Sequence, residues 1–257
     1  MIRRPPRSTQ SRSSAASDVY KRQEMAKVMA MNTAKVIIDP TESYGRIAEY
    51  PYSPRQQGAG MIQIDKAIKT PVVITDEKGK AGIALGSIGN SVTFTLVLRN
   101  FGDIDVTYNL EDKYGVLTDQ VLYGFNLTHT VPLTGAVVTF DKDTVTVPAN
   151  GEETVNVTLI IPQNAPRNIF AEGYISFIPH GSDVPELTVP YTAFYGNWDE
   201  PRVIDSPMWE EDTYYGFTGM AGEISGNLYF LGNIASLTPD PYTIAISPNG
   251  DGIFDYV

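Results

Sequence analysis

The stretch VTFTLVLRN, Val92 to Asn100, decides the fold class because its side chains alternate with the period of a β-strand. One face of the expected strand carries only apolar side chains: Val92, Phe94, Leu96 and Leu98. The other face carries two threonines and one valine. A strand with one apolar face is typical of an antiparallel sheet that covers a core on one side. We therefore expect a β-fold around this stretch.

Similar short runs of β-branched and aromatic residues lie on both sides of it, separated by turn residues: TPVVITD, DVTYNLE, AVVTFD, TVTVPANGEETVNVTLIIP, EGYISFIP and ELTVPYTAFYG. This pattern predicts an all-β sandwich over residues 71 to about 195, a Greek key of roughly seven or eight strands. Asn150-Gly151 is expected to form a hairpin turn between two of them. The run VLTDQVLYGFNLTHTVPLTG, residues 116–135, is expected as an insertion or a long loop.

Composition excludes several classes of function. The formal net charge of -11 argues against nucleic acid as a partner, because phosphate backbones are neutralised by clustered Lys and Arg. No run of about 18 apolar residues occurs, so no transmembrane helix is predicted. The chain has no cysteine, which removes disulfides, thiolate catalysis and cysteine metal sites.

Residues 1–23 differ from the rest of the chain in charge. They hold six basic residues and one acid, which leaves 13 Lys plus Arg against 29 Asp plus Glu in the remainder. A basic tail or a transit-like leader has this composition, whereas a secretory signal needs an apolar core that is missing here. The run SSAASDVYKRQ resembles translated sequencing-adapter sequence. We expect residues 1–23 to be an artefactual, disordered leader and Glu24 to be a break point.

Residues 24–70 predict a helix, a loop and a short strand. EMAKVMAMNTAKVI begins with strong helix formers, which Asn32 and Thr33 interrupt. DPTESYGRIAEYPYSP is expected as an irregular loop. In RQQGAGMIQIDKAI, Gly58 and Gly60 permit a positive φ or the close approach of another segment. Residues 62–64 alternate as a short strand would, and DKAI resembles a helical turn.

The two glycines could also belong to a phosphate-binding loop. A Walker loop needs Gly-Lys-Ser/Thr at the start of a helix, and a dinucleotide loop needs a third glycine after a buried strand. Neither is present in the chain, so nucleotide binding is not expected.

The order of these motifs carries a family resemblance. MNTA, the loop and SPRQQGAGMIQIDKAI resemble the end of the catalytic domain of subtilisin-like serine proteases. The likeness is strongest to cell-envelope proteinases of Gram-positive bacteria, the lactocepins and streptococcal complement peptidases. GNSVTFTLVLRNFGD and LTVPYTAFYGNW resemble the first fibronectin type III-like domain of the same proteins.

The resemblance implies where catalysis would reside. The nucleophile of that family lies in a Gly-Thr-Ser-Met-Ala motif upstream of the MNTA helix, with the Asp, His and oxyanion Asn further upstream, and this chain contains no such motif. A Ser-His-Asp mechanism needs its members within hydrogen-bond reach. We expect His129 and His180 to be exposed loop residues and not catalytic bases.

Two side-chain clusters near the C-terminal half could be binding sites. Four aromatic residues, Tyr191, Phe194, Tyr195 and Trp198, could form a ligand platform, and we favour core packing with an inter-domain hinge. The acidic run WEEDTYYG, residues 209–216, could mimic a paired-carboxylate glycosidase site. Adjacent carboxylates on a loop do not face each other across a sugar, so a solvated loop is favoured.

The last residues, SPNGDGIFDYV, offer oxygen ligands on a glycine-bent loop. Asn249, Asp251 and Asp255 are the ligand types that Ca²⁺ prefers, although the spacing is not that of an EF-hand. An Asx-type turn, in which these side chains bond their own backbone, is the reading we favour for this chain. As a hypothesis, the whole second domain binds Ca²⁺ here. No other cofactor is expected.

The expected fold class is mainly β: a Greek-key fibronectin III-like β-sandwich, preceded by a short α/β remnant of a subtilisin fold and followed by a truncated second β-domain. The expected domains are residues 1–23, 24–70, 71–198 and 199–257. The expected function is that of an accessory region, without the catalytic triad, of a secreted serine endopeptidase on the cell wall or surface of a Gram-positive bacterium. Its partners would be the upstream catalytic domain and protein or peptide substrates. The alternative is a stand-alone adhesion or carbohydrate-binding module.

Overall fold

The structure is a computed structural model. It describes residues 23–39, 50–122, 125–181, 183–200, 221–224 and 226–232, with the single positions 240, 242, 244 and 250. The chain divides into two units, Met1–Trp198 and Asp199–Val257.

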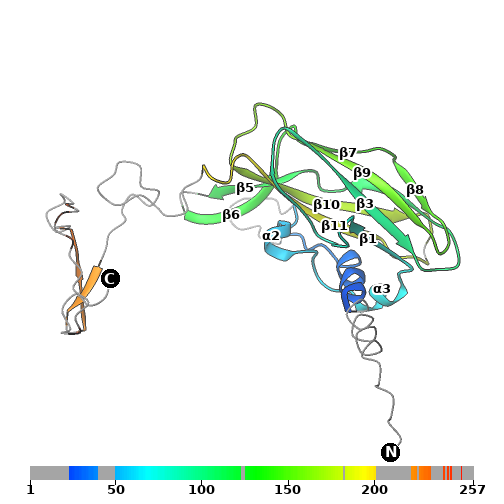
Figure 1. The fold of residues 1–257 in the computed structure, drawn as a ribbon, viewed down its shortest axis with the longest axis horizontal. Helices are drawn as coiled ribbons and strands as arrows, with labels where there is room; N and C mark the ends of the chain where they lie inside the picture. Colours follow the sequence, from blue (N-terminus) through cyan, green and yellow to red (C-terminus); the bar gives the residue numbers. More distant parts are fainter. Residues whose placement is uncertain are drawn as a thin grey trace, which may run out of the picture. The chain divides into compact units, whose positions relative to one another are not determined.

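The first unit is a β-sandwich of two sheets that share one core (Figure 1). The four-stranded sheet has the order β1 (Val72–Asp76), β3 (Ser91–Asn100), β9 (Glu152–Ile160) and β7 (Val137–Phe140). In the seven-stranded sheet, five strands lie side by side in the order β2 (Ile83–Ile88), β11 (Leu187–Tyr195), β10 (Ile169–Pro179), β4 (Val106–Asp112) and β8 (Thr144–Val147). Two further strands, β5 (Leu117–Leu122) and β6 (Phe125–Pro132), join it where Leu117 pairs with Glu172. The prediction of a mainly β fold is confirmed.

The core follows from the alternation in the sequence. Leu96 and Leu98 of β3 are fully buried, as the apolar face of VTFTLVLRN predicts, and Val155 and Val157 of β9 lie beside them. Burial of each such side chain stabilises the fold by about 1.5–3 kcal/mol. Opposing side chains come from the seven-stranded sheet: Ile175, Phe177, Val189, Tyr191 and Tyr195.

For residues 116–135, expected as an insertion or a long loop, the long-loop alternative is wrong, because β5 and β6 pair there as an antiparallel hairpin. Two other expectations about the sandwich are wrong. Asn150 has the positive φ of a turn residue, 53°, but it makes no hairpin, because β8 and β9 lie in different sheets and the turn joins the two layers. The strand count exceeds eight, since β2 and the β5–β6 hairpin were not expected as strands.

Among the described residues, three helical segments precede the sandwich. The helix over residues 23–32 confirms the helix expected from Glu24 onward, and its Val28 packs with Val73 and Ala81 beside β1. The two short helices are α2 (Pro54–Gln57) and α3 (Ile64–Lys69). Helix α3 confirms the helical turn expected at DKAI, and α2 was not expected.

In the second unit, the structure describes one antiparallel hairpin, β12 (Ala221–Ile224) with β13 (Asn227–Phe230). Gly226, at a φ of 82°, lies in its turn. No helix among the described residues is long and apolar enough to cross a membrane.

Candidate functional site

The outer face of β10 and β11 is covered by the segment that precedes the sandwich. Strand β10 is buried at seven consecutive residues, 171–177, although a strand with one free face should be buried at every second residue. Helix α2 contacts both β10 and β11 and lies beside them in Figure 1. The side chains that point from β10 toward this cover are those of Phe170, Glu172 and Tyr174. This covered face, where the preceding segment contacts the sandwich, is the candidate functional site.

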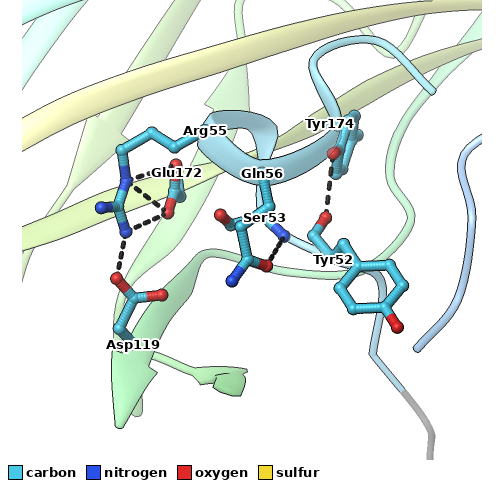
Figure 2. Close-up of polar contacts among 7 residues, drawn as sticks. All are labelled: Tyr52, Ser53, Arg55, Gln56, Asp119, Glu172 and Tyr174. Carbon is cyan, nitrogen blue, oxygen red and sulfur yellow. Dashed lines mark hydrogen bonds and ion pairs between the residues drawn. The ribbon is translucent and has the colours of Figure 1, made fainter. Parts of the chain in front are cut away.

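Arg55 on α2 forms the charged centre of the site (Figure 2). Its Nη2 atom lies 2.9 Å and its Nε atom 3.1 Å from Oε1 of Glu172, and Nη2 also pairs with Oδ2 of Asp119. The guanidinium lies 3.5 Å from the ring centroid of Phe170, a cation–π contact. Two carboxylates and one aromatic face therefore surround one cation.

Burial sets the electrostatics of this pair. The Glu172 side chain is fully buried, and that burial raises the pKa of its carboxyl above the ordinary value, while the Arg55 guanidinium opposes the rise. Burial alone would lower the pKa of Arg55, but Glu172 and Asp119 outweigh it and raise that pKa. A buried ion pair is stable only while both partners are present, because an isolated buried charge costs several kcal/mol.

Local sequence explains why α2 forms where it does. Pro54 occupies the first turn of the helix, where its missing N–H costs nothing. The Gln56 side chain reaches back so that its Oε1 accepts the Ser53 N–H at 3.3 Å. Gly58, at a φ of 64°, ends the helix after one turn, and its N–H donates to the carbonyl of Pro54 at 2.8 Å.

Polar contacts beside Arg55 attach the same segment along its length. The Tyr174 hydroxyl donates to the Tyr52 carbonyl at 3.0 Å (Figure 2). The same hydroxyl lies 3.3 Å from the Gly58 carbonyl. Gln57 exchanges two hydrogen bonds with the backbone of Ile37, at 2.9 and 3.0 Å. The Tyr174 bonds attach the segment to β10, and the Gln57 bonds join two parts of the segment to each other.

Gly60 lets two loops touch. Its φ is 110°, and a Cβ at this position would lie 2.3 Å from the Lys35 carbonyl oxygen. Lys35 and Met61 pair as an isolated antiparallel bridge beside it. The positive φ and close approach expected of this glycine are both present. The short strand expected over residues 62–64 is wrong, because α3 begins at Ile64.

The MNTA motif makes a similar attachment to the other sheet. Asn32 is fully buried, and its Oδ1 accepts the backbone N–H of Ile74 in β1 at 2.8 Å. The Thr33 hydroxyl donates to the Met29 carbonyl at 2.8 Å and so ends the first helix. The motif thus fixes the helix end to the sandwich.

One face of the attached segment is apolar and exposed. Its members are Met61, Ile62, Ile64 and Ile68, with exposed fractions from 54% to 76%. We call these four residues the α3 apolar face. Large exposed apolar patches mark protein contact surfaces, whereas single exposed apolar side chains are ordinary.

The four aromatic residues of the expected cluster separate onto two faces. Tyr191 and Tyr195 are buried in the core, as favoured above. Phe194 and Trp198 lie on the other side with Phe170, in edge-on contacts with centroids 4.5–5.7 Å apart. Trp198 is 59% exposed and lines a cavity of about 450 Å³ together with Gly86, Ser87 and Thr192.

The remaining predicted residues fall elsewhere. His180 is exposed beside β10, with Nε2 2.8 Å from Asn109 Oδ1. His129 is not a loop residue, because it lies half-buried in β6. Asn249, Asp251 and Asp255, the acidic run 209–216 and residues 1–22 lie outside the described residues. Among the residues that the structure does describe, no three His, Cys, Asp or Glu side chains are grouped to hold a metal ion.

Residues 83–192 match the family model of the Fn3-like domain. This part of the chain is an Fn3-like domain. The match begins at the first residue of β2 and ends within β11, so it covers the sandwich apart from β1 and the last three residues of β11.

Curated relatives extend the similarity beyond this domain. A PII-type proteinase of Lacticaseibacillus paracasei is 27% identical over 251 residues, which is 90% of this chain and 13% of the relative. A PIII-type proteinase of Lactococcus lactis subsp. cremoris (strain SK11) is 26% identical over 253 residues, 91% and 12% of the two chains. A C5a peptidase of Streptococcus pyogenes serotype M1 is 25% identical over 205 residues, which is 76% of this chain and 16% of the relative.

These proteinases and the peptidase are homologues of the chain. The chain spans between about a tenth and a sixth of the length of the relatives that it matches. The resemblance inferred from the MNTA and VTFTLVLRN motifs is confirmed at the level of homologous proteins and of the Fn3-like domain.

Proposed function

We propose that the chain is an accessory segment of a secreted, cell-surface serine endopeptidase of the subtilisin type. In this proposal, residues 24–70 end the catalytic domain, residues 71–198 form the Fn3-like sandwich that supports it, and residues 199–257 link to a second β-domain. The parent protein cleaves peptide bonds with a serine nucleophile that lies outside this chain. The homology to proteinases from Gram-positive bacteria supports both the activity and the location.

The α3 apolar face carries the proposal. Four large apolar side chains are exposed on a segment that the sandwich otherwise attaches through buried polar contacts. Leaving them in water forgoes about 1.5–3 kcal/mol for each side chain that a partner could bury. A catalytic domain that continues from this segment would cover the face.

The attachment gives the sandwich its supporting role. Arg55 bonds to Glu172 of β10 and Asn32 bonds to Ile74 of β1, so the segment is held to both sheets. Gln57 joins α2 to Ile37 within the segment itself. A segment fixed in this way transmits its position to whatever domain precedes it. The Fn3-like sandwich would thereby orient the catalytic domain without contributing a catalytic group.

The gene tests the proposal most directly. Reading the source DNA upstream of the Glu24 codon should reveal an in-frame Gly-Thr-Ser-Met-Ala segment followed closely by the MNTA helix. An open reading frame there without such a segment would refute the proposal. In a second test, a serine-directed fluorophosphonate should leave this chain unlabelled while labelling the parent protein, and labelling of this chain would contradict the assignment.

The cavity beside Trp198 supports a second candidate function, a ligand-binding surface module. The rings of Phe170 and Phe194 and the exposed indole of Trp198 form a platform of the type that binds sugars or apolar groups. Screening soluble oligosaccharides by quenching of tryptophan fluorescence tests this reading. A ligand whose quenching disappears in Trp198→Ala, while Phe101→Ala retains it, would favour the module.

A further inference from the structure

A groove of about 470 Å³ lies between the segment before the sandwich and the seven-stranded sheet. One side is formed by residues 33–38 and by α3, and the other by the turn after β4 and by parts of β10 and β11. Three buried hydroxyl residues line it: Thr33, Ser176 and Thr188. All of its residues belong to the first unit, so the groove is part of one compact body.

Lysines give the groove a positive charge. Lys35, Lys66 and Lys113 are exposed at its walls, and Glu186 is the one carboxylate that lines it. Lys113 pairs with Glu186 at 3.3 Å. Within the described residues, Lys35 and Lys66 have no ion pair.

This charge is unusual for the chain. After residue 23 the sequence has 13 basic and 29 acidic residues, yet three of the basic ones line a single groove. Burial alone would lower the pKa of Lys113, but Glu186 outweighs it and raises that pKa, so this ammonium stays charged at neutral pH. Exposed charges act over about one Debye length, near 8 Å at physiological ionic strength, so a local cluster attracts anions despite the acidic total.

We propose that the groove binds an acidic polypeptide segment, whose carboxylates pair with Lys35 and Lys66. The three ammonium groups come from three separate segments, so they match several carboxylates along a chain better than one small anion. The hydroxyls of Ser176 and Thr188 and the side-chain oxygen of Gln63 offer hydrogen bonds to a peptide backbone.

The groove is separate from the α3 apolar face. Lys66 lies two residues from both Ile64 and Ile68 on α3, and residues two apart on a helix do not share a face. A partner that covers the apolar face therefore leaves Lys66 free to contact a peptide. The proposed groove does not depend on the proposed protease function.

The test is direct binding of a fluorescein-labelled hexaglutamate peptide to the full chain, followed by fluorescence anisotropy at low ionic strength. Two exposed ion pairs contribute up to about 1 kcal/mol each, so the double variant Lys35→Gln/Lys66→Gln should weaken binding by about tenfold. The matched control, Lys78→Gln/Lys80→Gln, removes two exposed lysines from the β1–β2 turn and should bind as the unchanged chain does. Circular dichroism and an unfolding curve check that both variants are folded.

Three results would overturn the proposal. The first is no binding of hexaglutamate, and the second is equal loss in the groove variant and the control. The third is displacement of the peptide by inorganic phosphate at the same concentration as the peptide. That result would indicate a small-anion site. The proposal is supported if Lys35→Gln/Lys66→Gln loses hexaglutamate binding while the control variant keeps it. Labelled hexalysine should not bind in the same way.

Discussion

Arg55 and Glu172 lie 117 positions apart in the sequence, and a guanidinium nitrogen of one is 2.9 Å from a carboxylate oxygen of the other. Glu172 is fully buried, whereas the Arg55 side chain remains 32% exposed. The pair therefore joins the edge of the covering segment to the centre of the seven-stranded sheet. Because a buried carboxylate needs its counter-charge, this contact couples the position of α2 to the stability of the sandwich.

Arg55→Met should destabilise the chain by about 3 kcal/mol at pH 7, because it leaves Glu172 as an uncompensated buried charge. Burial already raises the pKa of Glu172, and losing Arg55 raises it further. A carboxyl whose folded pKa lies above its unfolded value contributes stability that is present at low pH and lost as pH rises through the folded pKa. The loss in free energy of unfolding caused by the substitution should therefore grow as pH rises above 4.5, the ordinary pKa of a glutamate carboxyl. Urea unfolding at pH 5 and pH 8 measures it.

Two controls accompany this substitution. Arg55→Met/Glu172→Gln should recover part of the lost stability, because the buried charge is gone. Arg99→Met removes an exposed pair with Glu152 and should cost at most about 1 kcal/mol. Equal losses at Arg55 and Arg99, with no pH dependence, would show that the buried pair has no special role.

Gly60→Ala should destabilise the chain by at least about 2 kcal/mol, since it adds a Cβ at a positive φ against the Lys35 carbonyl. Gly181→Ala is the matched control, because no atom lies within 4 Å of its added Cβ and its φ is ordinary. Thermal unfolding followed by circular dichroism compares the two. Similar melting temperatures for both variants would mean that the contact between the two loops is not tight.

Strands with clear alternation were predictable from the sequence, and the connections between them were not. VTFTLVLRN and ELTVPYTAFYG gave β3 and β11 because their apolar residues recur with period two. IALGSIGN was overlooked as β2, since Gly86 interrupts the pattern at a positive φ beside a register shift. The Asn150 turn shows that local turn chemistry does not say which sheet the next strand joins.

The candidate site was predictable only in part, because its members come from distant segments. Gly58 and Gly60 were found from their conformational freedom, whereas Arg55 and Glu172 were not. One signal was present: in EGYISFIP, a glutamate begins a strand run whose only other strongly polar residue is Ser176. A charge inside such a strand is rarely buried without a partner, so Glu172 required a cation from another part of the chain.

Asp112→Asn should stabilise the chain above pH 6. Burial, with a smaller contribution from Glu111, raises the pKa of Asp112 from 3.8 to about 6. Because the folded pKa exceeds the unfolded one, the contribution of Asp112 is complete below pH 3.8 and is lost as pH rises through about 6. The asparagine cannot ionise, so the variant should gain about 2–3 kcal/mol at pH 8 and much less near pH 4. Unfolding curves at both values test this, and a gain that is independent of pH would contradict it.

Calcium binding at Asn249, Asp251 and Asp255 stays a prediction. In the parent protein with its whole second domain, calorimetric titration with Ca²⁺ should release heat and raise the melting temperature, because oxygen ligands on a glycine-bent loop suit this ion. Asp251→Asn/Asp255→Asn should abolish both effects. No heat and no thermal shift in the unchanged protein would reject the site.

Ile64→Lys/Ile68→Lys should change association and leave stability almost as it was. Both side chains are mostly exposed, at 59% and 76%, so their burial contributes little to the free energy of folding of this chain. The free energy of unfolding should shift by no more than about 0.5 kcal/mol, which is usual for surface substitutions. Binding to a separately prepared catalytic domain of the parent protein, measured by calorimetry, should weaken by at least tenfold, because two apolar anchors of about 1.5–3 kcal/mol each are lost. Ile104→Lys, at an equally exposed site in the β3–β4 turn, is the matched control and should bind normally. Unchanged affinity in the α3 variant would mean that the α3 apolar face does not contact the catalytic domain.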